Sequence, residues 1–231
     1  MAGFLERLWD LLAPRTCPIC GQRLTVDQKI CCASCWFDLP QTGFENDFYD
    51  NQGAQRFLVQ LPYERCYSMF HYQIGGKVAK LVGTFKYHNH PELAVTFGKV
   101  LANQLKNTDF IEGIDVIVPV PLSSDRYRDR GYNQSEMLAR GFAEVTGLPV
   151  DTHVIKRKSF RTSQTHLNHW ERYENTRNAF ALVHPERVKG KHVLLIDDVL
   201  TTGSTLRDCG EQLLKAGDVK LSIVTVGVAT N

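Results

Sequence analysis

The chain has 231 residues, of which 43% are hydrophobic, 10% aromatic and 23% charged. These proportions are ordinary for a globular protein and exclude extended disorder and fibrous architectures, and the length allows one full domain with a small second one. Lys and Arg outnumber Asp and Glu by 27 to 25, so a binding site for a polyanion must be local rather than spread over the whole surface. No stretch approaches the ~20 apolar residues of a membrane span, which predicts a chain without a transmembrane segment.

Residues 1–15 have the pattern of a short amphipathic helix. Apolar residues between Phe4 and Leu12 are interrupted by Glu6, Arg7 and Asp10, and no small-residue cleavage site follows, which is unlike a secretory signal. We expect this helix to dock on the body of the protein; the alternative is a contact with a partner or a membrane surface. The expected location is the cytoplasm, with the inner face of the membrane as a candidate peripheral site.

Residues 16–40 have the cysteine spacing of a zinc ribbon. Cys17 and Cys20 form one C-x2-C pair, Cys32 and Cys35 form a second, and eleven residues lie between the pairs. Zinc takes four ligands in a tetrahedron, and each C-x2-C turn can supply two thiolates. The spacing predicts a structural Zn2+ whose four protein ligands leave no open position. An alternative stays open, because Cys31 with Cys35 would give C-x3-C spacing.

The chain between the two cysteine pairs is expected to form a hairpin with strands from Thr25, Val26 and Ile30. So small a ribbon should not fold without its metal. The total of seven cysteines is odd and clustered, which argues against a disulfide framework and for a reducing compartment.

Residues 41–62 are interpreted as a connector, because Phe44 to Gln60 is rich in Asn, Asp and Gln and shows weak periodicity, with room for one short helix. In residues 63–231 the expected strands are Cys66–Tyr72, Val116–Val120, Val150–Lys156, Phe180–Val183, His192–Ile196 and Val219–Val228. The expected helices are Lys77–Tyr87, one that opens at Pro91, Gln134–Val145 and Ser204–Ala216. Strands that alternate with helices predict an α/β domain with a mostly parallel sheet and helices on both faces.

The most informative segment runs from Val193 to Thr205 and reads VLLIDDVLTTGST. A buried strand is followed by Asp197 and Asp198 at its carboxyl end, where open α/β sheets bind their ligands. A turn rich in hydroxyl groups then opens a helix. Two adjacent carboxylates at such an edge are hard to explain as a plain strand–turn–helix, which is the structural alternative.

The turn after the two carboxylates has the chemistry of a phosphate site. Gly203 permits close backbone approach, and free amides at the helix start suit a phosphate monoester. Asp197 and Asp198 suit vicinal ribose hydroxyls or a magnesium ion beside that phosphate. The hydroxyl groups of the turn belong to Thr201, Thr202, Ser204 and Thr205. A phosphate next to a diol describes a ribose 5-phosphate, whereas the Walker A and dinucleotide fingerprints are missing.

The segment Val193–Thr205 resembles the signature of type I phosphoribosyltransferases, which bind 5-phosphoribosyl 1-pyrophosphate (PRPP). Together with RGYNQ at 130–134 and the four-cysteine ribbon, the chain resembles the ComF family of competence-linked, phosphoribosyltransferase-like proteins, also called GntX-like. The resemblance covers nearly the whole chain and implies a type I phosphoribosyltransferase fold, PRPP binding with Mg2+, and a link to DNA uptake or to the use of external DNA. Only one set of four zinc-spaced cysteines is present, which departs from the double ribbon of the family.

The resemblance also implies roles for residues outside the signature. Pro119, Val120 and Pro121 would form the loop that holds pyrophosphate, and Arg130 and Lys86 would supply its positive charge. The resemblance therefore predicts a phosphoribosyltransferase. The sequence identifies neither its acceptor nor its general base.

A second function is compatible with the same sequence. The window Thr152 to Trp170 holds Lys, Arg and His but no Asp or Glu, and Phe160, Trp170 and Tyr173 could stack on bases. The alternative is therefore a non-enzymatic module that uses the fold as a PRPP or nucleotide sensor and binds single-stranded DNA or the DNA-uptake machinery.

Overall fold

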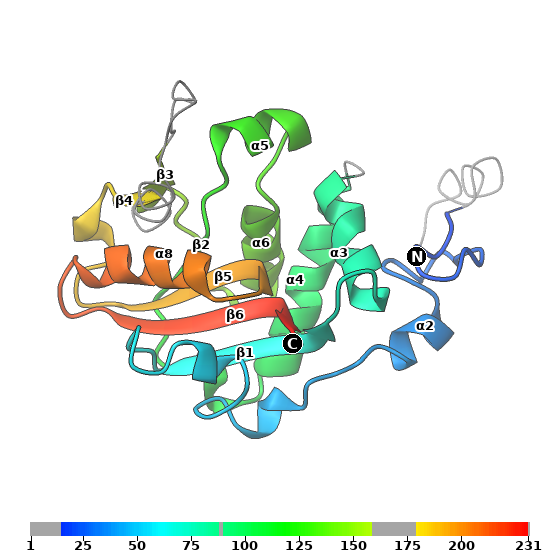
Figure 1. Ribbon diagram of the computed structural model, residues 1–231, viewed down its shortest axis with the longest axis horizontal. Helices are drawn as coiled ribbons and strands as arrows, with labels where there is room; N and C mark the ends of the chain where they lie inside the picture. The colour runs from blue at the N-terminus through cyan, green and yellow to red at the C-terminus, as the bar shows by residue number, and fades with distance from the viewer. Residues whose placement is uncertain (1–14, 88–89, 159–178, 231) are drawn as a thin grey trace, which may run out of the picture.

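A computed structural model describes residues 15–87, 90–158 and 179–230. At its centre lies a sheet of four parallel strands in the order β1 (Arg65–Tyr72), β6 (Lys220–Ala229), β5 (His192–Leu200) and β2 (Val116–Pro119) (Figure 1). The register pairs Ile196 of β5 with Pro119 of β2 and with Val224 of β6. The end of β2 therefore lies beside the point of β5 where Asp197 and Asp198 begin.

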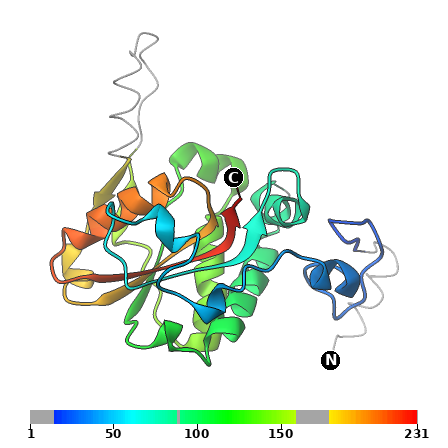
Figure 2. The same ribbon diagram turned by 60° about the horizontal axis from the view of Figure 1, so that its bottom comes forward.

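Helices cover both faces of the sheet. Leu194 and Ile196 of β5 belong to one hydrophobic core, and Val193 and Leu195 belong to the other, as the two-residue period of a strand requires. The first core is closed by α3 (Lys77–Tyr87), α4 (Pro91–Leu105) and α6 (Gln134–Thr146). The second is closed by α8 (Ser204–Leu214), so the two helical layers sandwich the sheet (Figures 1 and 2). The expected α/β architecture with a parallel sheet is confirmed.

Two strands differ in extent from the sequence prediction. β5 continues past Ile196 to Leu200, because Asp197 and Val199 still pair with β6. β3 (Ile155–Arg157) begins five residues later than expected, and it pairs antiparallel with β4 (Phe180–Leu182) in a separate two-stranded sheet. Val150, where the strand was expected to start, forms only one isolated bridge, with Ile117 of β2.

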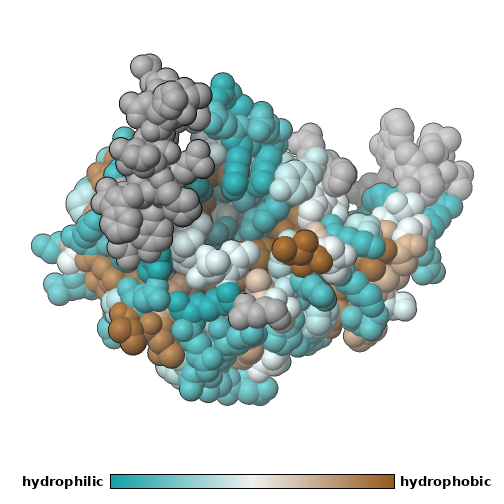
Figure 3. All heavy atoms as spheres, in the orientation of Figure 1, coloured by the Kyte–Doolittle hydropathy of each residue, from teal (hydrophilic) through white to brown (hydrophobic). Residues whose placement is uncertain are grey.

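The helix α5 (Ser124–Arg130) was not predicted from the sequence. Its residues, SDRYRDR, have no apolar face that would give a helical period. The helix is delimited by its caps instead: the Ser123 hydroxyl accepts from the Arg126 amide, and Gly131 adopts a left-handed conformation with φ +77°. Figure 3 shows the resulting hydrophilic surface over this helix.

Residues 41–62 contain two short 3-10 helices, η1 (Phe44–Asn46) and η2 (Ala54–Arg56), where one short helix was expected. Phe48 and Phe57 in this segment are buried against the two cores of the sheet. Two further 3-10 helices, η3 (Asp109–Ile111) and η4 (Pro185–Arg187), lie in loops that lead into β2 and β5.

The cysteine-rich segment lies at one end of the molecule, beyond α3 (Figures 1 and 2). Its antiparallel contact is a single bridge between Thr16 and Arg23, so the expected hairpin strands at Thr25, Val26 and Ile30 do not form. The second cysteine pair opens the short helix α2 (Ala33–Phe37). The amphipathic helix predicted for residues 1–15 falls almost wholly outside the described residues. Among the helices that the structure describes, none has the length and apolar character needed to cross a membrane.

Candidate functional site

The two aspartates at the end of β5 are held by the first turn of α6. The Ser135 hydroxyl donates to Asp197 Oδ1 at 2.7 Å, and Gln134 Nε2 donates to Asp198 Oδ2 at 2.9 Å. The turn itself is fixed by Asn133, which caps α6 and donates from Nδ2 to the Val120 carbonyl at 3.0 Å. The end of β2 therefore positions the helix that positions both carboxylates.

Lys86, in the last turn of α3, completes this cluster. Its Nζ lies 2.9 Å from Asp198 Oδ1, and both side chains are largely buried. Burial and the neighbouring charge of Asp198 raise the pKa of Asp197 from 3.8 to about 7, against the opposing effects of Ser135, the Asp198 amide and Lys86. Near neutral pH the pair thus carries less than two negative charges.

A cavity of about 200 Å³, here named the inner cavity, lies at this edge of the sheet. Four cationic side chains line it against the two aspartates, so it has an excess of positive charge that suits a polyanion. Its lining residues are Tyr72, Lys86, Val120, Pro121, Leu122, Arg126, Arg130, Gln134, Ser135, Arg157, Asp197, Asp198, Val199, Thr201 and Thr205.

Most of the residues predicted for PRPP are brought together here. Lys86, Arg130, Val120, Pro121, Thr201 and Thr205 line the inner cavity with both aspartates. Pro119, Thr202, Gly203 and Ser204 flank it without lining it.

The turn that precedes α8 is shaped by Gly203 and Thr202. Gly203 has φ +82°, a conformation that favours glycine, and an added Cβ would meet Phe57 at 3.2 Å. The Thr202 hydroxyl donates to Ser204 Oγ at 3.1 Å and accepts from the Ser204 amide at 3.4 Å. Hydroxyl groups and helix-start amides therefore gather at one short turn, as a phosphate site requires.

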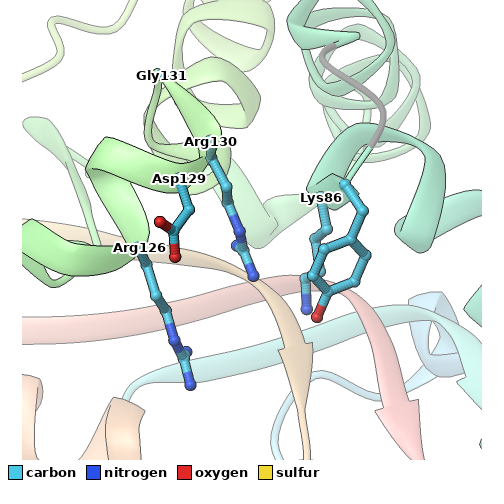
Figure 4. Close-up of a pocket in the computed structure, with 6 residues that line it drawn as sticks. Lys86, Arg126, Asp129, Arg130 and Gly131 are labelled. Atoms are coloured by element: carbon cyan, nitrogen blue, oxygen red, sulfur yellow. The ribbon is translucent and has the colours of Figure 1, made fainter.

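A second cavity of about 790 Å³, the outer cavity, adjoins the first and shares Lys86, Arg126 and Arg130 with it. Figure 4 shows these three side chains extending from α3 and α5 into the same space. The outer cavity is also lined by Tyr87, Asp129 and Gly131. The unpredicted helix α5 thus supplies two of the three shared cations.

Sequence reasoning gave no role in the site to Gln134 or Arg56, whereas Arg157 in the basic window and Arg126 beside it were candidates for a contact with pyrophosphate or nucleic acid. A role for Gln134 could have been predicted, because it starts the expected helix Gln134–Val145 after the two strands' shared edge had been placed at Val120 and Asp197. Arg157 lies 5.2 Å from the Phe180 ring centroid, and burial followed by repulsion from Arg126 lowers its pKa. Arg56 donates to the carbonyls of Thr201 and Ala229, far away in sequence, and no local pattern signals such contacts.

The four predicted zinc ligands also meet. The sulfur atoms of Cys17, Cys20, Cys32 and Cys35 all lie within 4.8 Å of one another, and Cys20 Sγ is 3.7 Å from Cys32 Sγ. Zn–S bonds of about 2.3 Å in a tetrahedron put sulfur atoms about 3.8 Å apart, so this geometry fits Zn2+. Cys31 is not part of this group of four sulfur atoms, which favours Cys32 in the open alternative.

The backbone around Cys17 favours its thiolate, whereas burial and the neighbouring cysteine side chains raise the pKa of Cys35. Burial opposes ionisation of Cys17, but the amides of Cys32, Cys20 and Ile19 point at its sulfur and bring its pKa down to about 6. Thiolate sulfur is the form that binds zinc. The four-sulfur donor set and its spacing therefore suit a structural zinc ion.

The basic window is only partly described. Lys156, Arg157 and Lys158 lie in or next to β3, whereas Phe160, Trp170 and Tyr173 lie outside the described residues. The predicted stacking platform of the DNA-binding alternative therefore stays a prediction.

Comparison with known proteins agrees with this architecture. Residues 87–230 match the model of the phosphoribosyl transferase domain family. The DNA utilization protein YhgH of Salmonella typhi is 33% identical over 165 residues, which are 70% of this chain and 71% of that protein.

Competence proteins are similar as well. Competence protein F of Haemophilus influenzae is 31% identical over 147 residues, 62% of this chain and 64% of that protein. Competence protein ComFC of Bacillus subtilis is 26% identical over 201 residues, 87% of this chain and 72% of that protein. With a phosphoribosyl transferase domain and relatives of these names, the chain belongs to the ComF family.

Proposed function

We propose that this protein binds PRPP with Mg2+ at the inner cavity. The proposal rests on the buried pair Asp197 and Asp198, which lies beside a hydroxyl-rich turn. Four cationic side chains among the described residues line the same cavity. Asp197 and Asp198 would hold the ribose hydroxyls and the magnesium ion. The turn of residues 201–205 holds the 5-phosphate, with the Thr201 and Thr205 side chains on the cavity side.

The pyrophosphate group lies between the end of β2 and the cations of α3 and α5. The loop of Pro119, Val120 and Pro121 approaches it with backbone groups, and Lys86 and Arg130 stabilise its charge. Magnesium, when bound with PRPP, would neutralise further charge on the leaving pyrophosphate.

The reaction that this arrangement serves is phosphoribosyl transfer. A nitrogen atom of the acceptor forms a bond to C1 of the ribose, the bond from C1 to pyrophosphate oxygen breaks, and pyrophosphate leaves with the electron pair. The acceptor nitrogen releases its proton to solvent. The names of the relatives link them to DNA utilization and competence, and we place this chain in the same process.

Calorimetry of the zinc-loaded full chain with Mg-PRPP tests the proposal. We expect a dissociation constant in the micromolar range, about −8 kcal/mol, for the wild type. The Asp197→Asn, Asp198→Asn double variant should lose binding, because uncharged amides replace both carboxylates. Thr205→Val, which keeps the carboxylates and removes one hydroxyl from the cavity, should weaken binding about fivefold.

The control is Asp125→Asn, which changes an exposed carboxylate of α5 outside both cavities and should leave the affinity unchanged. Circular dichroism shows whether each variant is folded. Failure of the folded wild type to bind Mg-PRPP would overturn the proposal. In that case, single-stranded oligonucleotides that bind, and bind less tightly as salt rises, would favour the DNA-binding module.

A further inference from the structure

The outer cavity has room for a ligand group that the proposed PRPP site does not use. Its volume of about 790 Å³ is in the range of small-molecule pockets, whereas the inner cavity has about 200 Å³. The two share Lys86, Arg126 and Arg130, so a ligand anchored in the inner cavity can extend directly into the outer one. The remaining lining residues, Tyr87, Asp129 and Gly131, set what that extension can be.

Tyr87 is the aromatic side chain of the outer cavity. It is the last residue of α3 and directly follows Lys86. The end of α3 therefore places Lys86 beside Asp198 and Tyr87 in the outer cavity. The Arg130 guanidinium lies 5.1 Å from the Tyr87 ring centroid and covers one face of the ring. The side chain nevertheless remains 72% exposed, which leaves ring surface open to a second planar group.

A chain of contacts connects this ring to the candidate ribose site. Asp198 accepts from Gln134 at 2.9 Å, Gln134 Oε1 accepts from Arg130 Nη1 at 2.9 Å, and Arg130 lies over Tyr87. Arg130 is thereby held between the carboxylates and the ring. A planar group on Tyr87 would lie next to the reacting end of the ligand rather than at a remote surface.

The other two lining residues narrow the chemistry of that group. Asp129 is the one carboxylate among the described residues that line the outer cavity, and a carboxylate accepts hydrogen bonds from N–H donors. Gly131 has open space around its Cα and brings no side chain into the cavity. The outer cavity thus combines a stacking surface, an acceptor for N–H groups and room for a flat ring.

We propose that Tyr87 is the stacking platform for a planar, nitrogen-containing heteroaromatic acceptor, and that the outer cavity is the acceptor subsite. This inference rests on the proposed function, because it takes the inner cavity as the place of the ribose 5-phosphate. Its observable consequence is that a base attached to ribose 5-phosphate adds affinity, and that the added affinity depends on the Tyr87 ring.

The test compares the 5′-monophosphates of adenosine, guanosine, cytidine and uridine with ribose 5-phosphate by calorimetry on the zinc-loaded full chain. At least one nucleotide should bind about tenfold more tightly than ribose 5-phosphate, as stacking on an aromatic ring provides. Tyr87→Ala should abolish this ratio and leave the affinity for ribose 5-phosphate in place. Tyr87→Phe should retain the ratio.

The matched control is Tyr127→Ala, which removes an exposed tyrosine of α5 that lines neither cavity and should keep the ratio. A ratio unchanged in Tyr87→Ala, or no nucleotide tighter than ribose 5-phosphate, would overturn the platform while PRPP binding stands. Failure of both PRPP and ribose 5-phosphate to bind would instead overturn the proposed function. In that event, nucleotide binding that needs Tyr87 would support the platform, and its absence would overturn the platform too.

Discussion

Asp197 is the residue through which pH should act most directly on the stability of the site. Its pKa lies near 7 in the folded chain, raised by burial and by Asp198 from 3.8, the ordinary value expected after unfolding. Between about pH 4 and pH 7 the Asp197 carboxyl keeps its proton in the folded state and has released it in the unfolded state. The contribution of Asp197 to the free energy of unfolding is therefore fully present below about pH 4 and is lost as pH rises through 7. Each pKa unit corresponds to about 1.4 kcal/mol, so the loss is at most about 4 kcal/mol.

Asp197→Asn should therefore flatten the pH dependence of stability. The asparagine can keep an oxygen that accepts from Ser135 and from the residue 198 amide, but it has no charge to lose or gain. Urea denaturation at pH 5 and pH 8 measures the effect: the drop in free energy of unfolding should be smaller in the variant than in the wild type. Asp125→Asn, at an exposed ion pair, should reproduce the wild-type drop. An equal drop in Asp197→Asn would show that this carboxyl group does not govern the pH response.

The packing of α4 against α6 depends on two glycines. A Cβ added at Gly98 would overlap the Leu138 carbonyl, and one added at Gly141 would overlap the Val95 carbonyl. Both obstacles are backbone, which cannot rotate away as a side chain can. Since α6 also starts with Gln134 and Ser135, this close crossing fixes the helix that holds the two aspartates.

Gly141→Ala should consequently destabilise the chain although alanine is the better helix former. The helix propensity gain is about 1 kcal/mol, and the overpacking cost of about 1–3 kcal/mol or more exceeds it because the helices must separate. Gly83→Ala in α3 is the matched control, since an added Cβ there meets nothing within 4 Å. Thermal unfolding should show a lower midpoint for the first variant and an equal or higher one for the second. A stabilised Gly141→Ala would contradict the close crossing.

On the scale of the whole molecule, the sequence predicts those parts whose signal is local. The helix Lys77–Tyr87, the parallel sheet and the two cysteine pairs follow from period and spacing. The helix α5 was not predicted, because its caps, rather than an apolar face, define it. Strand β5 was expected to end before Asp197, because two adjacent charged residues are typical of a loop. Only the pairing with β6 shows that the strand continues through them.

The candidate site shows the same limit. Its carboxylates and hydroxyl turn form one short segment and could be found, whereas their partners come from distant parts of the chain. Gln134 meets Asp198 across 64 positions, and Arg56 meets the Thr201 carbonyl across 145. Such contacts depend on the strand order and on the segment that crosses over the sheet, which no local period encodes.

The cysteine group differs from the candidate site, because a metal bound there would hold a segment whose described residues do not line the inner cavity. Trp36 of α2 joins the two parts through ring contacts with Phe70 and Phe97, at 5.8 and 6.5 Å between centroids. Within the described part of the chain, the residues that line the inner cavity lie between Tyr72 and Thr205. Loss of a metal bound there should therefore loosen the ribbon and its packing on the sheet without disrupting the proposed PRPP site.

Replacing Cys32 by alanine should remove the metal, since three thiolates bind Zn2+ far less tightly than four. Metal analysis should find about one zinc per chain in the wild type and in Cys31→Ala, and much less in Cys32→Ala. The zinc-free variant should unfold at a lower temperature and be cut by protease within residues 15–40, because so small a ribbon lacks a core of its own. Its affinity for Mg-PRPP should stay within about threefold of the wild-type value, a difference in binding free energy of at most about 0.7 kcal/mol. Zinc retained in Cys32→Ala but lost in Cys31→Ala would reassign the fourth ligand, and PRPP binding lost together with zinc would show that the ribbon supports the site.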